Sequence, residues 1–348
     1  MRLTVSPGCG LSSVATALLL TALVPEASAA TGINVHSLDP RLAARYAQAG
    51  FRIVRSDLAW CRVETSPGRY EWSAYDAFVA ALRSQGLTPL LVLGYGNDLY
   101  DAGLAPHTPE ARAAFARFAA AAALRYPGAI FEVWNEPNVA WSWKPAPNPE
   151  AYVQLVAETA AAIRRAADDT RVLGLSLGGR SLDETYAARA FRAGLLDHVD
   201  AIALHPYAAG EPDGMPALYA RIRRLMGREE RPLVVTEWGH ACSLSSEAGQ
   251  ARRLVDCLRV NARSGIDLTV LYEWQDEGDD PGNPEDHYGL LHCDGSPKQA
   301  YQAVVEELRQ GDSPALTTLR RHAPYNNRRR VVFPCALSSG TIGCAGPP

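Results

Sequence analysis

The stretch IFEVWNEPN, residues 130–138, places an apolar run directly before a tryptophan, an asparagine and a glutamate. A second run, LVVTEWG at 233–239, closes in a similar way and carries Glu237 where the first carries Glu136. Each run has the length and composition of a buried parallel strand. In a barrel of parallel strands the C-terminal ends meet at one face, where active sites lie. The two runs therefore predict two carboxylates that share one site.

The rest of the chain alternates short apolar runs with amphipathic segments. Eight runs are typical of buried strands, and they lie at 32–36, 51–57, 88–95, 129–136, 171–179, 200–207, 232–239 and 268–274. Apolar residues recur at intervals of three and four in the segments 111–126, 152–167, 248–264 and 298–308, which predicts helices. Eight strand–helix units favour a closed α/β fold, the (β/α)8 TIM barrel. An open nucleotide-binding sheet would usually have a Gly-rich loop where this chain has HSLDP, residues 36–40.

We expect one catalytic domain, residues 30–309, between a signal peptide and a short C-terminal extension. Leu11–Val24 is apolar but shorter than the ~20 residues of a membrane-spanning helix, and the following Ala27-Ser28-Ala29 fits the rule for signal cleavage. We interpret residues 1–29 as a secretory signal, so the protein is expected to be secreted or periplasmic. An uncleaved N-terminal anchor is the alternative. No later segment is apolar for long enough to span a membrane.

The cysteines and the charge give further limits. Seven cysteines are present, and an even number remains when Cys9 is lost with the signal peptide, which permits disulfides in an exported chain. Cys335 and Cys344 are close together in the tail, residues 310–348, and are the pair that we expect most to form a disulfide.

The segment RRHAPYNNRRR at 320–330 indicates a solvated tail or an anchor for an anionic polysaccharide. A formal net charge of −4 gives no indication of nucleic-acid binding, and a monomer is expected.

Polar and aromatic side chains gather where the predicted strands end. The strand ends carry His36, Arg55, Asp57, Asn135, Glu136, His205, Tyr207, Glu237, Trp238, Glu273 and Trp274. Core packing alone does not predict ionisable residues at these positions, whereas a catalytic barrel does. Trp141 and Trp143 lie in a Pro-rich loop after the fourth strand, and we expect them to contact substrate because the C–H faces of sugars pack on aromatic rings. These residues indicate a saccharide partner.

The same motifs carry a family resemblance. WNEPN at the end of the fourth strand and TEWG at the end of the seventh resemble glycoside hydrolase clan A, the 4/7 superfamily. GRYEWSAYD at 68–76, WSWKP at 141–145 and HYGLLHCDGSPKQAY at 287–301 are similar to family 39 and related cellulase-like glycosidases. The resemblance covers most of residues 32–308. The tail after about residue 310 has no counterpart in it.

The resemblance implies roles for residues at matching positions. Glu136 matches the general acid/base and Glu237 the nucleophile. The residues expected to bind substrate around them are Arg55, Asn135, His205, Tyr207, Trp274, Trp143, Trp238 and His36. The resemblance puts Asn135 on the sugar 2-hydroxyl and Trp274 under the −1 sugar. It puts Arg55 and Tyr207 beside the nucleophile, where a guanidinium that cannot deprotonate keeps a carboxylate ionised.

The implied activity is retaining hydrolysis of O-glycosidic bonds in a poly- or oligosaccharide by double displacement, with no cofactor and no metal. The two carboxyl groups should then lie ~5–5.5 Å apart. The sugar and its linkage stay open. Endo action is favoured because the aromatic residues are spread over several loops.

Two other kinds of barrel protein are alternatives. A metal-dependent isomerase or hydrolase would need a cage of nitrogen and oxygen ligands, drawn from His36, Asp57, Glu136, His205, Glu237 and His240. Arg55 would place a fixed positive charge beside such a metal. A non-catalytic saccharide-binding barrel usually lacks one of the two carboxylates, and both are present here. Of the other acids, Glu132 is predicted to be buried and paired, Asp57 to be a hydrogen-bond partner within a loop, and Glu273 to be a substrate ligand or a rim acid.

Overall fold

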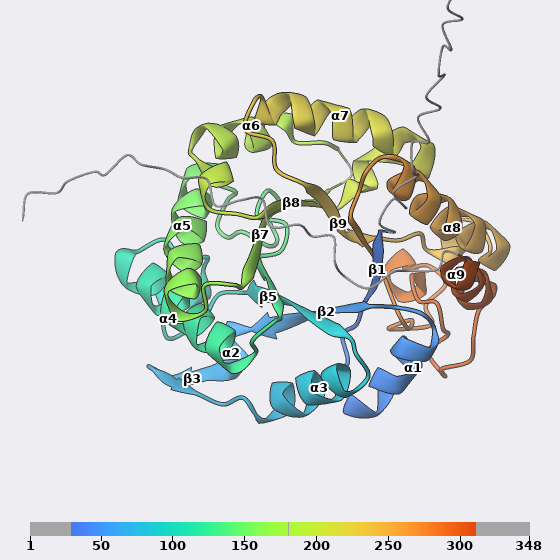
Figure 1. The fold of residues 1–348 in the computed structure, drawn as a ribbon, viewed down its shortest axis with the longest axis horizontal. Helices are drawn as coiled ribbons and strands as arrows, with labels where there is room; N and C mark the ends of the chain where they lie inside the picture. Colours follow the sequence, from blue (N-terminus) through green and yellow to red (C-terminus); the bar gives the residue numbers. More distant parts are fainter. Residues whose placement is uncertain (1–28, 180, 311–348) are drawn as a thin grey trace, which may run out of the picture.

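The computed structural model describes residues 29–179 and 181–310, in which eight parallel strands close into a barrel. The order around the barrel is β1-β10-β9-β8-β7-β6-β5-β2, and each strand in this order is hydrogen-bonded to the next (Figure 1). The strands are β1 Ala30–Asn34, β2 Ile53–Ala59, β5 Thr88–Gly94, β6 Ile130–Val133, β7 Arg171–Leu177, β8 Ala201–Leu204, β9 Leu233–Trp238 and β10 Leu268–Leu271. All the predicted strands are present, and the predicted TIM barrel is confirmed.

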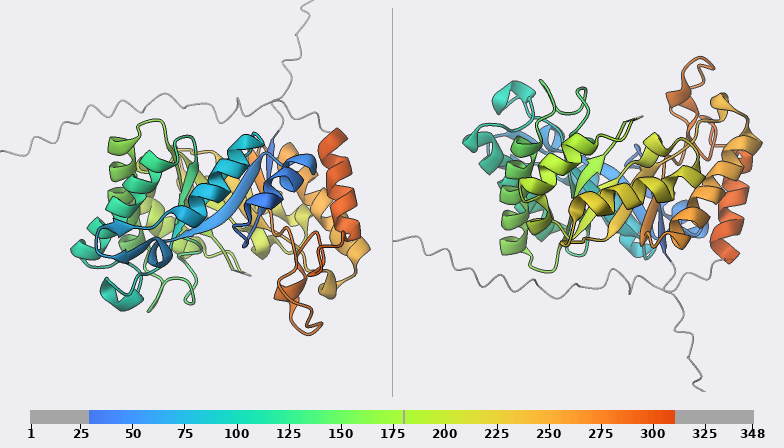
Figure 2. Two further views of the ribbon diagram at one scale, coloured as in Figure 1. Left: turned by 90° about the horizontal axis from the view of Figure 1, so that it is seen from below. Right: turned by 90° about the horizontal axis from the view of Figure 1, so that it is seen from above.

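Helices surround the barrel on its outer side (Figures 1 and 2). They are α1 Ala43–Gln48, α3 Ser73–Ser84, α4 Pro109–Arg125, α5 Pro149–Ala166, α6 Glu184–Arg192, α7 Met215–Met226, α8 Glu247–Arg263 and α9 Gln299–Gln310. A short insertion after β2 contains α2 Trp60–Val63 and the hairpin of β3 Glu64–Ser66 and β4 Arg69–Tyr70. Both α4 and α5 begin with a proline, after Thr108 and Asn148, whose side chains accept a hydrogen bond from the first turn. The predicted helices correspond to α4, α5, α8 and α9.

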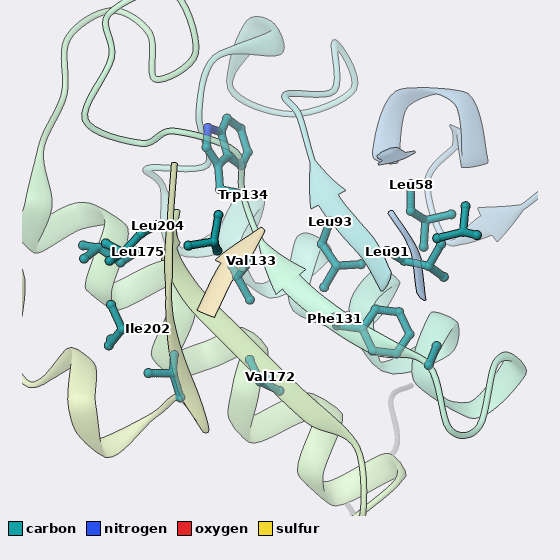
Figure 3. Packing of buried hydrophobic residues seen from close by; sticks show 14 of the residues in the cluster. Leu58, Leu91, Leu93, Phe131, Val133, Trp134, Val172, Leu175, Ile202 and Leu204 are labelled. Carbon is teal, nitrogen blue, oxygen red and sulfur yellow. The ribbon is translucent and has the colours of Figure 1, made fainter. Parts of the chain in front are cut away.

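Apolar side chains pack on both faces of the barrel wall. The larger cluster lies between strands and helices and includes Leu91, Phe131, Val133, Val172 and Leu204 (Figure 3). A smaller cluster fills the inside and includes Ile53, Leu90, Val92, Ile130, Val234 and Val270. Because side chains alternate along a strand, the inward positions that follow Ile53 on β2 are Arg55 and Asp57. The interior thus changes from apolar to polar toward the C-terminal ends of the strands.

Part of the predicted organisation lies outside the described residues. This holds for the signal peptide, apart from Ala29, and for the C-terminal extension with Cys335 and Cys344. The four cysteines in the described part of the chain are free thiols. Within residues 29–179 and 181–310, no helix is both long and apolar enough to cross a bilayer.

Candidate active site

A cavity of about 760 Å³ opens at the C-terminal ends of the strands. Most of the predicted site residues line it, namely His36, Arg55, Asn135, Glu136, Tyr207, Glu237 and Trp238. His205 lies directly behind Glu136 and contacts its carboxylate. Residues from strands far apart in the sequence therefore meet at one site, as the pattern of strand ends predicts.

Glu136 and Glu237 lie together in this cavity. One oxygen of each carboxylate and one ring nitrogen of His205 all lie within 4.8 Å of one another. Both acids are largely buried, with side-chain exposures of 11% for Glu136 and 13% for Glu237. Two carboxyl groups about 5–5.5 Å apart are typical of retaining glycosidases, whereas inverting ones have about 6.5–9.5 Å. The approach of the two acids is closer than the separation of an inverting pair and is compatible with a retaining one.

The Arg55 guanidinium links Glu237 to the interior of the barrel. Its Nη1 donates to Oε2 of Glu237 at 3.0 Å, and its Nε donates to Oε2 of Glu132 at 2.8 Å. Its Nη2 donates to the side-chain oxygen of Asn135 at 2.8 Å. Burial alone would raise the pKa of Glu132, but the charges of Arg55 and His205 outweigh burial and lower it. Glu132 is therefore the buried, paired acid that the sequence predicts.

His205 and Tyr207, which follow β8, contact different acids. Nδ1 of His205 is 3.0 Å from Oε1 of Glu136, and Nε2 is 3.2 Å from Oγ1 of Thr236. The Tyr207 hydroxyl donates to Oε1 of Glu237 at 3.1 Å. Burial lowers the pKa of His205, but the nearby carboxylates of Glu237 and Glu136 outweigh burial and raise it overall. Glu136 thus has a titratable imidazole as its neighbour, and Glu237 has a guanidinium and a phenol.

Comparison with known families shows which family the chain belongs to. Residues 27–277 match the family model described as cellulase, glycosyl hydrolase family 5. The chain belongs to this family. It is a glycosyl hydrolase, in agreement with the resemblance of its motifs to clan A. No curated protein sequence matches the hydrolase.

Solved structures of families 39 and 5 have the same fold as the hydrolase. A family 39 glycoside hydrolase from the gut symbiont Bacteroides cellulosilyticus WH2 is 27% identical, with a TM-score of 0.69 over 81% of this chain and 64% of that chain. A family 39 β-xylosidase from Caulobacter crescentus is 22% identical, with a TM-score of 0.63 over 81% and 72%. A GH5_18 protein from Bifidobacterium longum subsp. infantis is 15% identical, with a TM-score of 0.67 over 83% and 80%. The hydrolase spans less than two thirds of the length of the Bacteroides protein.

Glu136, His205 and Glu237 of the hydrolase also have the spacing of metal ligands. Direct hydrogen bonds account for this spacing, since His205 bonds to Glu136. The permanent positive charge of Arg55 lies 3.0 Å from Glu237 and would repel a cation there. The donor set therefore fits proton chemistry better than metal binding.

A second charged group lies where β1 and β10 end. Nε2 of His36 is 3.1 Å from Oε2 of Glu273, and Nδ1 is 3.6 Å from Oε1 of Glu277. The hydrogen bond to Glu273 raises the pKa of His36 to about 9, and burial raises the pKa of Glu273 to about 7. His36 is therefore positively charged near neutral pH and lines the cavity. This ion pair accounts for the metal-ligand spacing of the three side chains.

Two predicted substrate-binding tryptophans lie outside the cavity. Trp274 packs edge-on against Tyr46 of α1, with ring centroids 4.8 Å apart. Trp143 is buried, with its ring centroid 5.2 Å from that of Trp134. The strand β10 ends at Leu271, so the regular alternation of side chains does not extend to Trp274. The positions of both residues fit packing rather than contact with a sugar.

Other aromatic residues occupy the cavity wall instead. Tyr95, Tyr272 and Tyr288 line it, and Trp141 lies at its rim with 59% of its surface exposed. Tyr95 closes the predicted strand at 88–95, and Tyr272 lies within the predicted strand at 268–274, so a search of every strand end for aromatics would have found both. Tyr288 belongs to a loop, where no periodicity marks it.

Asp57 is a further residue of the wall, and its environment differs from the predicted one. It lines the cavity beyond Arg55 on β2, and burial raises its pKa. No residue in the described part of the chain donates a hydrogen bond to its carboxylate. The expectation that Asp57 is a hydrogen-bond partner within a loop is therefore wrong. Its oxygens are available to a ligand.

Proposed function

We propose that the protein is an exported retaining glycoside hydrolase that cleaves O-glycosidic bonds in a poly- or oligosaccharide, with Glu136 as acid/base and Glu237 as nucleophile. The observation that carries this proposal is the approach of the two carboxylates to within 4.8 Å. At that separation no water fits between the sugar and the second carboxylate, so the carboxylate itself must attack.

The partners of the two acids distinguish their roles. Arg55 and Tyr207 both donate hydrogen bonds to Glu237, and these bonds orient its carboxylate for attack on the anomeric carbon. Glu136 contacts His205, and no guanidinium in the described residues bonds to it. We therefore assign proton transfer to Glu136 and nucleophilic attack to Glu237.

The reaction then takes two steps. In the first, an oxygen of Glu237 bonds to the anomeric carbon, the bond from that carbon to the leaving oxygen breaks, and Glu136 gives its proton to the leaving oxygen. In the second, Glu136 takes a proton from water, the water oxygen bonds to the anomeric carbon, and the bond to Glu237 breaks. Each step inverts the anomeric centre, so the product retains the configuration of the substrate.

The composition of the cavity supports a hydroxyl-rich substrate. Trp141 offers an exposed ring at the rim for the C–H face of a sugar. The Asp57 carboxylate can accept hydrogen bonds from sugar hydroxyls, and the charged His36 can orient others. Aromatic residues lie on several loops around the opening, which favours endo action on a chain that extends past it.

Export is supported by the sequence alone. The apolar stretch Leu11–Val24 followed by Ala27-Ser28-Ala29 favours secretion, or delivery to a periplasm. A glycan outside the cytoplasm would then be the natural substrate.

Proton NMR of the first product tests the central proposal. The protein is incubated with a panel of polysaccharides, and the anomeric signal is read before mutarotation. Retained configuration is expected, and inverted configuration would refute the assignment of the two acids. Activity should survive a chelator, which a metal-dependent barrel would not tolerate. Hydrolysis of no glycan at all would instead favour a saccharide-binding barrel.

A further inference from the structure

Asn138 joins the loop after β6 to the end of β7. Its Nδ2 donates to the backbone oxygen of Gly178 at 2.9 Å, and the Gly178 N–H donates to Oδ1 of Asn138 at 3.0 Å. Asn138 is the second asparagine of the NEPN motif and follows Glu136 by two residues. Asn138 does not line the cavity. It acts on the site through its two hydrogen bonds to Gly178.

Gly178 lies directly against the Glu136 carboxyl group. A Cβ atom at position 178 would lie 2.0 Å from Oε1 of Glu136 and 2.5 Å from its Cγ. No side chain other than hydrogen fits there while Glu136 keeps its place. Gly178 is thus hydrogen-bonded to Asn138 and packs against the carboxyl group of Glu136.

The backbone around Glu136 needs such support. Trp134 and Glu136 have φ angles of 69° and 46°, in the left-handed region that residues with a side chain rarely adopt. Backbone of this kind persists only where its surroundings hold it. β6 itself ends at Val133, so the strand does not extend to Glu136.

We propose that Asn138 and Gly178 are positioning residues that set the carboxyl group of Glu136 at its distance from the sugar. The proposal rests on the function proposed above, in which Glu136 donates a proton. Asn138 fixes Gly178, Gly178 lies against the carboxyl group, and Nδ1 of His205 contacts Oε1 of the same group at 3.0 Å. A small displacement of a catalytic group can cost about 100-fold in rate.

Substrates with different leaving groups separate this role from general loss of structure. A phenyl glycoside needs the proton from Glu136, whereas a 2,4-dinitrophenyl glycoside leaves without it. We expect Asn138→Ala to lower kcat/KM about 10- to 100-fold for the phenyl glycoside and to change it little for the dinitrophenyl glycoside. Gly178→Ala should give the same split. Both probes are built on the sugar that the wild-type enzyme cleaves.

Asn97→Ala is the matched control. Asn97 also bonds to the backbone through its side chain, donating to the oxygen of Glu64 at 2.8 Å and to that of Trp60 at 3.5 Å, and accepting from the N–H of Leu99 at 3.0 Å. It is buried and does not line the cavity. Its loss should reduce stability and affect both glycosides equally. A split in the control, or equal losses with both probes in Asn138→Ala, would overturn the proposal.

Crystal structures give a readout that does not depend on activity. In Asn138→Ala the Glu136 carboxyl group should move away from position 178, whereas in Asn97→Ala it should keep its wild-type place. An unmoved carboxyl group in Asn138→Ala refutes the positioning role. A wild-type enzyme that cleaves no glycoside refutes the proposed function instead, so the two failures are distinguishable.

Discussion

Nη1 of Arg55 lies 3.0 Å from Oε2 of Glu237, and Nε of the same guanidinium lies 2.8 Å from Oε2 of Glu132. Arg55 therefore bonds to two acids: Glu237, which lines the cavity, and Glu132, which is fully buried. Its charge balances Glu132 in the interior, and its hydrogen bond orients Glu237 at the surface of the cavity. Stability and chemistry thus depend on one side chain.

Removal of Arg55 should unfold the protein more easily. Arg55→Leu leaves the buried Glu132 without its guanidinium partner, which should lower the free energy of unfolding by about 3–5 kcal/mol. Arg259→Leu is the control, because its pair with Glu307 at 2.6 Å is exposed on the arginine side and such pairs contribute about 0–1 kcal/mol. Urea denaturation measures both. Equal losses in the two variants would contradict the role of Arg55 in the interior.

Loss of the nucleophile should stop turnover without unfolding the protein. Glu237→Gln keeps the size of the side chain and removes the attacking oxygen anion, so activity should fall by several orders of magnitude while the melting temperature changes little. In the wild type, a mechanism-based fluorosugar should label Glu237, as read by peptide mass spectrometry. A label on Glu273 would mean that the wrong acid has been assigned.

Loss of the acid/base should leave the first step possible for activated substrates. With Glu136→Ala, a dinitrophenyl glycoside should still form the glycosyl-enzyme, which should accumulate because no base activates water. Azide needs no such base and should speed its breakdown, giving a glycosyl azide of retained configuration. Stopped-flow kinetics with and without azide checks this. Neither a burst nor rescue by azide would be expected if another residue were the acid/base.

The pair of His36 and Glu273 should make stability depend on pH. The pKa of His36 is raised to about 9, so protonation of His36 contributes stability that is fully present below its unfolded value near 6.5 and is lost as pH rises through 9. Burial raises the pKa of Glu273 to about 7, so ionising it also costs stability as pH rises through 7. His36→Gln should therefore melt below the wild type at pH 6, with a smaller difference at pH 10. Thermal denaturation between pH 6 and pH 10 measures this difference in melting temperature between the variant and the wild type. A difference that grew with pH would contradict a stabilising role for protonated His36.

Export should be visible in the mass of the mature protein. Cleavage after Ala29 leaves Ala30 as the first residue in the secreted or periplasmic fraction. Non-reducing mass spectrometry should also find Cys335 and Cys344 joined, because disulfides persist in oxidising compartments. A protein that keeps Met1 with all its thiols free would exclude both predictions.

The sequence by itself determined the barrel and the pairing of Glu136 with Glu237 at one site. Hydrophobic periodicity marks strands and helices because it reflects which face of each element is buried. Parallel strands that close into a barrel bring their C-terminal ends together, so Glu136 and Glu237 could be paired across 101 residues of chain (237 − 136) without a structure. Arg55, Asn135 and Tyr207 followed by the same rule, since each lies at or just beyond a strand end.

Tertiary structure alone decided where side chains point once a strand has ended. Trp274 lies only a few residues beyond β10, yet its ring packs against α1 while Tyr272 lines the cavity. Alternation holds only while the backbone stays in the ladder of hydrogen bonds, and loops follow contacts that no local pattern encodes. The bonds between Asn138 and Gly178 belong to the same class, because they join segments that are distant in sequence and meet only in the folded chain.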